Sequence, residues 1–175
     1  MPVLDFIQPI LDQPIVSRIR RNHGLEHATL HMLAQRFPRT SFAGHSDAGG
    51  FWILGDATTE EIKSAVAEAL SRLKQGEHSL AVHPNCGTNL AAASVLAGLV
   101  GGLAMASAGQ RWRDKLKRLP MVISLVSLAL LSAQPLGLFL QRMVTTSGMP
   151  EGLQVTGIQA TRRGNWRAHR ITTQG

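Results

Sequence analysis

The sequence contains two long stretches that have no charged residue. Neither Gly87–Gln110 nor Leu119–Gln141 holds an Asp, Glu, Lys or Arg. Each stretch exceeds the ~20 residues that a helix needs to cross the hydrocarbon core of a bilayer. The sequence therefore predicts a hairpin of two transmembrane helices, at about 89–108 and 120–140. Two buried helices of a soluble protein are the alternative, which we disfavour because uncharged stretches this long are unusual in a chain of 175 residues.

Cysteine is nearly absent, and acidic residues are scarce in the second half of the chain. Cys86 is the only cysteine, which excludes an intramolecular disulfide. Residues 110–175 contain ten Lys or Arg against only Asp114 and Glu151. This positive charge flanks the apolar stretches, so we expect the lipid bilayer, with its anionic headgroups, as the partner rather than nucleic acid.

The first 22 residues are apolar in places but too interrupted to span a membrane. Acidic residues and prolines break the run, and no basic stretch precedes it, so we expect no signal peptide. We interpret residues 1–22 as a segment that lies at the membrane surface.

Residues 23–88 have the periodicity of a small α+β domain. Asn22 can cap a first helix, and Pro38 ends it. The capping box Thr58-Thr59-Glu60-Glu61 opens a second, amphipathic helix. In chain order, the predicted elements are a helix over 23–36, strands over 40–42 and 51–54 joined by a Gly-rich loop, a helix from 59 to Gly76, and a strand over 79–83.

Residues 142–175 are predicted to form a basic tail. The alternation over 153–173, with Arg162-Arg163-Gly164-Asn165 in its middle, predicts a β-hairpin with a basic face. The predicted fold is therefore a small soluble α+β domain (helix, β-hairpin, helix, strand), then a transmembrane hairpin over 89–141, then a short basic β-like tail.

The first helix carries the strongest chemical signal, His23-Gly24-Leu25-Glu26-His27. Two histidines at positions i and i+4 share one helix face and can bind one metal ion, while the nearby glutamate can act as a general base. The spacing is that of the inverzincin metallopeptidases. His31 extends the stripe by one turn and is a possible additional ligand. The alternative is a solvated polar face or a histidine packed against the sheet.

A second motif, His83-Pro84-Asn85-Cys86-Gly87-Thr88-Asn89, precedes the first predicted membrane helix. The positive end of that helix would favour the thiolate of Cys86. Cys86 or His83 could then complete a zinc site that keeps an open position for water. The alternatives are an ordinary buried cysteine, or thiol catalysis without metal in which Cys86 is the nucleophile and His83 or His27 the base.

Together, HGLEHATLH over 23–31 and HPNCGTN over 83–89, followed by a membrane hairpin, resemble a bacterial membrane family, domain of unknown function 6391. Over residues 20–140 the chain is also similar to a larger family, domain of unknown function 1385, described as predicted metal-dependent enzymes. Ala28 stands where that larger family has lysine, and its upstream membrane helices are missing, so their roles are not carried over. The resemblance implies a metal site but no particular reaction. The positions that match are His23, Glu26, His27, His31, His83 and Cys86.

These patterns predict a membrane-anchored zinc-dependent hydrolase that acts on a peptide or lipid-linked substrate at the bilayer surface. His23 and His27 would bind zinc, with Cys86 or His83 as third ligand, and Glu26 would be the general base. A non-catalytic membrane protein with a structural metal site is one alternative, and a metal-free thiol enzyme using Cys86 is another.

The expected location is the bacterial inner membrane. Five positive charges in the loop 110–119 argue that this loop is cytoplasmic. The opposite orientation needs no export of the first 88 residues and keeps Cys86 in a reducing compartment. We therefore expect the soluble domain to be cytoplasmic.

Overall fold

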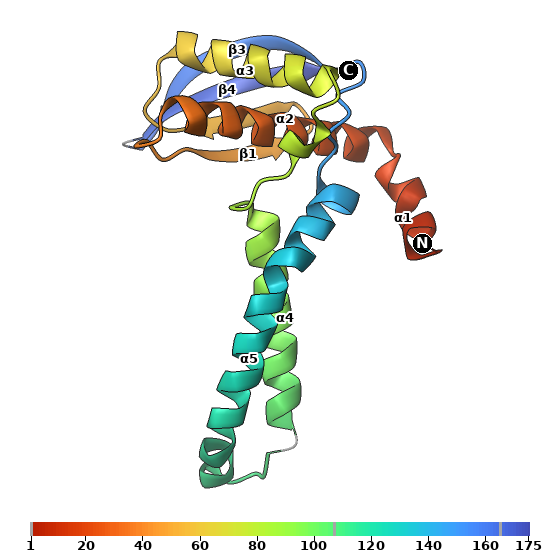
Figure 1. The fold of residues 1–175 in the computed structure, drawn as a ribbon, viewed down its shortest axis with the longest axis vertical. Helices are drawn as coiled ribbons and strands as arrows, with labels where there is room; N and C mark the ends of the chain where they lie inside the picture. Colours follow the sequence, from red (N-terminus) through yellow and green to blue (C-terminus); the bar gives the residue numbers. More distant parts are fainter. Residues whose placement is uncertain (1, 107, 165) are drawn as a thin grey trace. The chain divides into compact units, whose positions relative to one another are not determined.

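The computed structural model describes residues 2–106, 108–164 and 166–175, which form two compact units (Figure 1). The first unit combines Met1–His83 with Arg142–Gly175, and the second is Pro84–Gln141. Residues from both ends of the chain therefore fold together, and the second unit is an insertion between them.

A four-stranded antiparallel sheet organises the first unit. Strands β1 (Ala43–Asp47), β2 (Gly50–Leu54), β3 (Gln154–Arg163) and β4 (Trp166–Gln174) lie in the order β1-β2-β4-β3. The predicted hairpin of the tail is confirmed, but the tail is not a separate appendage, because β4 pairs with β2. The physical reason is that a lone two-stranded hairpin is marginally stable in water, whereas four strands with one covered face are stable.

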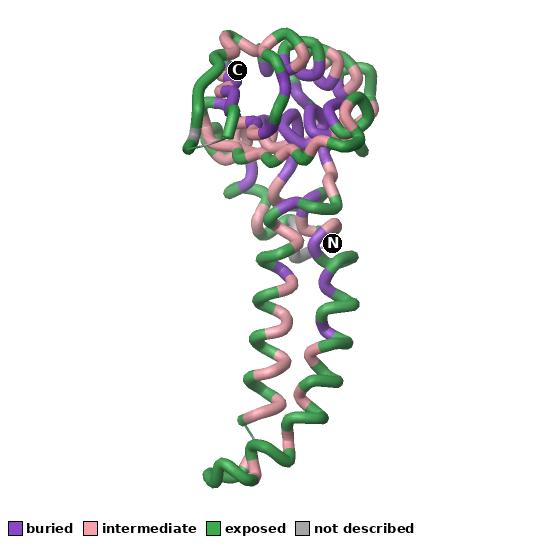
Figure 2. Tube along the Cα trace, turned by 90° about the vertical axis from the view of Figure 1, so that its left-hand side faces the viewer, coloured by how far each residue is buried: buried purple, intermediate pink, exposed green. Residues whose placement is uncertain are grey.

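Two helices bury one face of this sheet. Helix α2 (Pro14–Arg36) contacts β1 and β2, and helix α3 (Thr59–Lys74) packs beside α2 and contacts β3. Alternate strand residues point toward these helices, so the buried residues of this unit gather between helices and sheet (Figure 2). The largest fully buried side chains of this core are Leu25, Met32, Leu33, Phe51, Ile53, Ile62, Leu73, Leu153 and Ile171.

Helix α2 begins earlier than predicted, because Pro14 rather than Asn22 opens it. Asn22, the predicted cap, is 0 % exposed inside the helix. Its Nδ2 donates to the carbonyl oxygen of Asp47 at 2.8 Å, and its Oδ1 accepts from the hydroxyl of Thr173 at 2.7 Å. This amide therefore joins α2 to both β1 and β4, which is why a polar residue stands in the interior of the helix.

The short elements of the first unit differ from those predicted from the sequence. The strand predicted over 40–42 was wrong, because β1 occupies the Gly-rich stretch that was interpreted as a loop. The strand predicted over 79–83 was wrong as well, since His78–Ala81 forms a 3-10 helix, η1. The capping box of α3 is confirmed, with the N–H of Thr58 donating to Glu61 Oε2 at 2.7 Å.

The second unit is a helical hairpin. Helices α4 (Gly87–Ala106) and α5 (Trp112–Leu140) pack against each other, and η2 (Gln141–Thr145) is a short π-helical continuation of α5. Both helices are long and apolar enough to cross a membrane. Most of their surface is exposed (Figure 2), including large apolar side chains such as Leu131, which is 77 % exposed.

A further short helix, α1 (Pro2–Leu11), precedes α2. Phe6 and Ile10 are exposed on it. The interruption by Pro9 does not prevent the helix, although the helix is too short to span.

Replacing Asn22 with Ala should destabilise the protein. It leaves the carbonyl of Asp47 and the hydroxyl of Thr173 without their buried partner, which costs about 1–3 kcal/mol. We expect a lower midpoint in thermal unfolding of detergent-purified protein. Gln75→Ala is the control, because Gln75 bonds only on the helix surface, to Ser71. Equal midpoints for the Asn22 and Gln75 variants would contradict a linking role for Asn22.

Candidate metal site

One stripe of helix α2 carries four of the predicted site residues. His23, His27 and His31 follow one another at successive turns, and Glu26 lies on the flank of this stripe. His27 is 1 % exposed and Glu26 is 4 % exposed, so this polar face is buried. The solvated face that was the alternative for this helix is therefore excluded for these two side chains.

A glycine within the motif lets another segment lie directly on the helix. A Cβ added at Gly24 would stand 2.0 Å from the carbonyl oxygen of Ser147. The N–H of Ser147 donates to the carbonyl of Arg20 at 2.9 Å, which fastens the segment after η2 to α2. Gly24 thus serves close packing of the backbone beside the histidines.

Each histidine of the stripe is held by a backbone carbonyl. His23 Nδ1 lies 2.9 Å from the oxygen of Thr145, His27 Nδ1 lies 2.8 Å from that of Ala81, and His31 Nε2 lies 2.9 Å from that of Val82. Because a carbonyl only accepts, the bonded nitrogen carries the proton and the other ring nitrogen of the neutral imidazole has a lone pair. Metal-binding histidines have this second contact in most known sites.

The imidazole rings form a cluster that includes His83, which follows η1. The ring centroids of His23 and His27 are 4.4 Å apart, and that of His83 lies 5.7 Å from His27 and 4.8 Å from His31. Ligand atoms of His23 and His27 lie within 4.8 Å of one another. Two nitrogens that share a tetrahedral zinc ion are about 3.4 Å apart, given Zn–N bonds near 2.0–2.1 Å, so small rotations of these rings suffice.

Electrostatics favour the neutral form of His83. Burial, together with neighbouring His31 and His27, lowers the pKa of His83 to about 4. At neutral pH this ring is therefore uncharged and has a lone pair to donate, and the neutral imidazole is the form of histidine that binds zinc in proteins.

Glu26 occupies the flank of α2 that faces strand β1. The hydroxyl of Ser46 donates a hydrogen bond to Glu26 Oε2. A Cβ added at Gly44 would lie 2.2 Å from Glu26 Oε1, so a side chain at this position would displace the carboxylate from the strand. Burial is the main influence on this group and raises the pKa of Glu26, although the Ser46 hydrogen bond and His23 oppose the shift. A raised carboxyl pKa is typical of a general base that works near neutral pH.

Cys86 belongs to the second unit, where it precedes the first turn of α4. The N–H of Thr88 donates to Cys86 Sγ at 3.4 Å, and the Thr88 hydroxyl lies 3.5 Å from the same sulfur. Both contacts place the sulfur at the amino end of the 20-residue helix α4. Cys86 follows His83 by three residues, so covalent geometry keeps their Cα atoms within about 11 Å of each other.

Several residues of the site could not be recognised from the sequence. Ser46 lies in a stretch that was interpreted as a loop, and its alternation with Gly44 on the inner face of β1 was the only available signal. The carbonyls that hold the histidines are backbone groups and have no sequence signal. His45 and Asp47, expected in a loop, lie on β1, where Arg170 bonds both oxygens of Asp47.

Comparison with known proteins assigns the chain to a family. Residues 18–158 match the family described as Domain of unknown function (DUF6391). An uncharacterized protein of Picosynechococcus sp. is 34 % identical over 154 residues, which cover 81 % of this chain and 71 % of that protein. No solved structure matches the chain. The matched residues include the histidine stripe, His83, Cys86 and both apolar helices, and the chain is a member of the DUF6391 family, whose function is unknown.

Proposed function

We propose that this protein is a membrane-anchored, zinc-dependent hydrolase. The observation that carries the proposal is the pairing of His23 and His27, each oriented by a carbonyl, beside the buried carboxyl of Glu26. Burying such a carboxyl costs free energy, which a purely structural helix face would avoid by placing an apolar residue there. Functional sites are where such costly arrangements are found.

The ligand set that we propose has two fixed members and one alternative. His23 and His27 would bind the metal through Nε2, because a carbonyl occupies Nδ1 in each ring. Cys86 or His83 would supply the third ligand. His83 is supported by its ring contacts with His27 and His31, and Cys86 by its position at the amino end of α4, three residues further along the chain.

Glu26 would act as the general base. A zinc ion held by these ligands would supply Lewis acidity, which makes water more acidic and polarises the bond to be cleaved. Glu26 Oε1 would take the proton from that water, while the Ser46 hydroxyl keeps Oε2 in place. Gly44 leaves room for Oε1 at the surface of β1. The substrate that we propose is a peptide or a lipid-linked molecule, because the site belongs to a chain anchored in a bilayer.

The connectivity of the first unit supports membrane insertion of the hairpin. Strand β2 precedes the hairpin and β4 follows it, yet the two pair in one sheet. The chain must therefore return to the side of the membrane from which it left. Two membrane crossings bring it back, whereas a single crossing would not. Exposed leucines along α4 and α5, such as Leu103 and Leu131, are then covered by lipid.

A structural metal site is the second candidate function. The ring of His83 contacts those of both His27 and His31, so four nitrogen or sulfur donors could close the site and exclude water. Such a site would fasten η1 and the following residues to α2 without catalysis.

Metal analysis should give about one zinc ion per chain in detergent-purified protein prepared without chelator. The double variant His23→Ala/His27→Ala should lose it, because both fixed ligands are gone. His78→Ala is the control, since the ring of His78 bonds the carbonyl of Gly148 and is not part of the stripe. Elemental analysis measures both, and wild-type protein without metal would refute the proposed site.

The same preparations, loaded with cobalt in place of zinc, distinguish the two third ligands. A thiolate ligand produces a strong near-ultraviolet charge-transfer absorption, which Cys86→Ser would abolish. Absence of this absorption in the wild type, together with metal loss in His83→Ala, would assign the position to His83.

Replacing Glu26 with Gln should leave the metal content unchanged and reduce turnover by at least about 100-fold, the usual contribution of a general base. Turnover is measured with zinc-loaded protein against fluorogenic peptide and lipid-linked substrate panels, counting only hydrolysis that a chelator stops. Glu60→Gln is the control, because Glu60 is an exposed residue of α3. Wild-type rates in Glu26→Gln would exclude Glu26 as the general base, and absence of chelator-sensitive hydrolysis in the wild type would favour the structural site.

Membrane insertion predicts that the protein stays in the membrane fraction after alkaline carbonate extraction and leaves it only with detergent. Substituting Leu131 by Arg should let carbonate extract a large share of the protein from the membrane fraction. A cation at the centre of a membrane helix costs about 2.5–3.5 kcal/mol on insertion scales. Ser64→Arg, at an exposed position of α3 in the first unit, is the control for a change in charge. Complete release of the wild type by carbonate would contradict insertion.

A further inference from the structure

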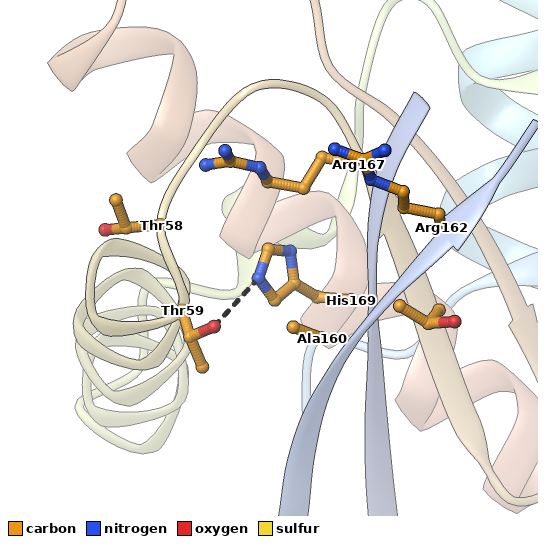
Figure 3. Close-up of a pocket in the computed structure, with 7 residues that line it drawn as sticks. Thr58, Thr59, Ala160, Arg162, Arg167 and His169 are labelled. Carbon is orange, nitrogen blue, oxygen red and sulfur yellow. Dashed lines mark hydrogen bonds between the residues drawn. The ribbon is translucent and has the colours of Figure 1, made fainter. Parts of the chain in front are cut away.

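A second polar depression lies in the first unit, lined by residues that the proposed metal site does not use. Thr58 and Thr59 at the start of α3 form one wall, and Arg162, Arg167 and His169 of strands β3 and β4 form the other (Figure 3). Its volume is about 530 Å³, which suits a small ligand.

Two arginines face each other across the hairpin at this depression. Arg162 of β3 pairs directly with Arg167 of β4 in the strand register. Like charges at directly opposite positions destabilise a sheet, so another function must favour this pair. Asp56 lies 3.6 Å from Arg167 but is largely exposed, so its carboxylate offsets the positive charge of Arg167 only weakly. Arg39 lines an adjoining depression together with the same two arginines and adds to the positive charge.

His169 supplies an independent indication of a ligand. The residue is only 1 % exposed, and its Nε2 lies 3.2 Å from the hydroxyl of Thr59. The other ring nitrogen, Nδ1, is buried and has no hydrogen-bond partner among the residues that the structure describes. In Figure 3 this nitrogen is on the side of the ring toward the arginines. A buried polar atom left unpaired costs about 1–3 kcal/mol, which a ligand that accepts its hydrogen bond would recover.

The protonation of His169 determines which ligand suits it. Burial is the main cause that lowers the pKa of His169, so the ring is neutral at physiological pH. When the Thr59 hydroxyl donates to Nε2, Nδ1 keeps the proton and is a donor. The depression then presents a guanidinium pair and an imidazole N–H, both of which attract an anion. The amino end of α3 contributes no further attraction, because Glu60 and Glu61 stand in its first turn and Glu61 already accepts the N–H of Thr58.

We infer that this depression binds a phosphate group, with Arg162 and Arg167 as bidentate donors and His169 completing the site. Arginine is the preferred side chain for such bidentate contacts. The phosphate belongs either to a soluble phosphate ester or to a phospholipid headgroup. This site goes beyond the proposed hydrolase and does not depend on it.

The test uses the full chain in detergent and in nanodiscs. Glycerol 3-phosphate is titrated into detergent-purified protein by calorimetry, and a second arm compares nanodiscs of phosphatidylcholine with and without phosphatidic acid. We expect saturable binding at one site per chain, weakened at least about tenfold in Arg162→Gln and in Arg167→Gln, because each loses a bidentate contact. Binding of the soluble ester identifies a soluble source, and binding only in nanodiscs with phosphatidic acid identifies a headgroup.

Lys63→Gln is the matched control, because it removes one positive charge from the exposed surface of α3 outside the depression. Equal thermal unfolding of the three variants establishes that each is folded. Absence of saturable binding in both arms would overturn the inference. The same would follow from equal weakening in Lys63→Gln, which would indicate general attraction between charges.

Discussion

The fold of the first unit depends on the burial of polar side chains along helix α2. Asn22, Glu26 and His27 are almost inaccessible to water, and buried polar groups are stable only when they are hydrogen-bonded. Their partners come from three places in the chain: β1, η1, and the interior strand β4 of the sheet. The position of each of these elements is thus set by a bond to α2, and the same bonds orient the histidines.

This arrangement explains why the proposed chemistry needs so few residues. The carbonyls that satisfy His23 and His27 also determine which ring nitrogen is left for a metal. The hydroxyl of Ser46 both satisfies Glu26 and keeps one carboxylate oxygen in place. The bonds that allow α2 to be buried are therefore those that would orient metal ligands and base, and folding and site formation coincide.

The sequence predicted those features that local patterns encode. The capping box of α3, the uncharged stretches of α4 and α5, and the alternation of the last hairpin each depend on neighbouring residues, and all three were found. Prediction from the sequence failed where a residue contacts a partner that is far away in the chain. Gly44 was interpreted as a loop residue, but it is a strand glycine that makes room for Glu26. Asn22 was interpreted as a cap, but its amide links two strands that lie far apart in the chain. The histidine stripe was recognisable because its spacing is local, whereas its carbonyl partners were not.

The position of β4 between β2 and β3 constrains the order in which the protein can be made. When the ribosome has synthesised β1, β2 and α3, the only β-structure available is a two-stranded hairpin with one edge open. That edge stays open while both apolar helices are synthesised, and it closes only when β4 has been made. The sheet can thus be complete only in chains in which the helical hairpin of α4 and α5 has already been synthesised. The proposed metal site would become active only in chains that have passed this step, because the segment holding His23 lies beyond the hairpin.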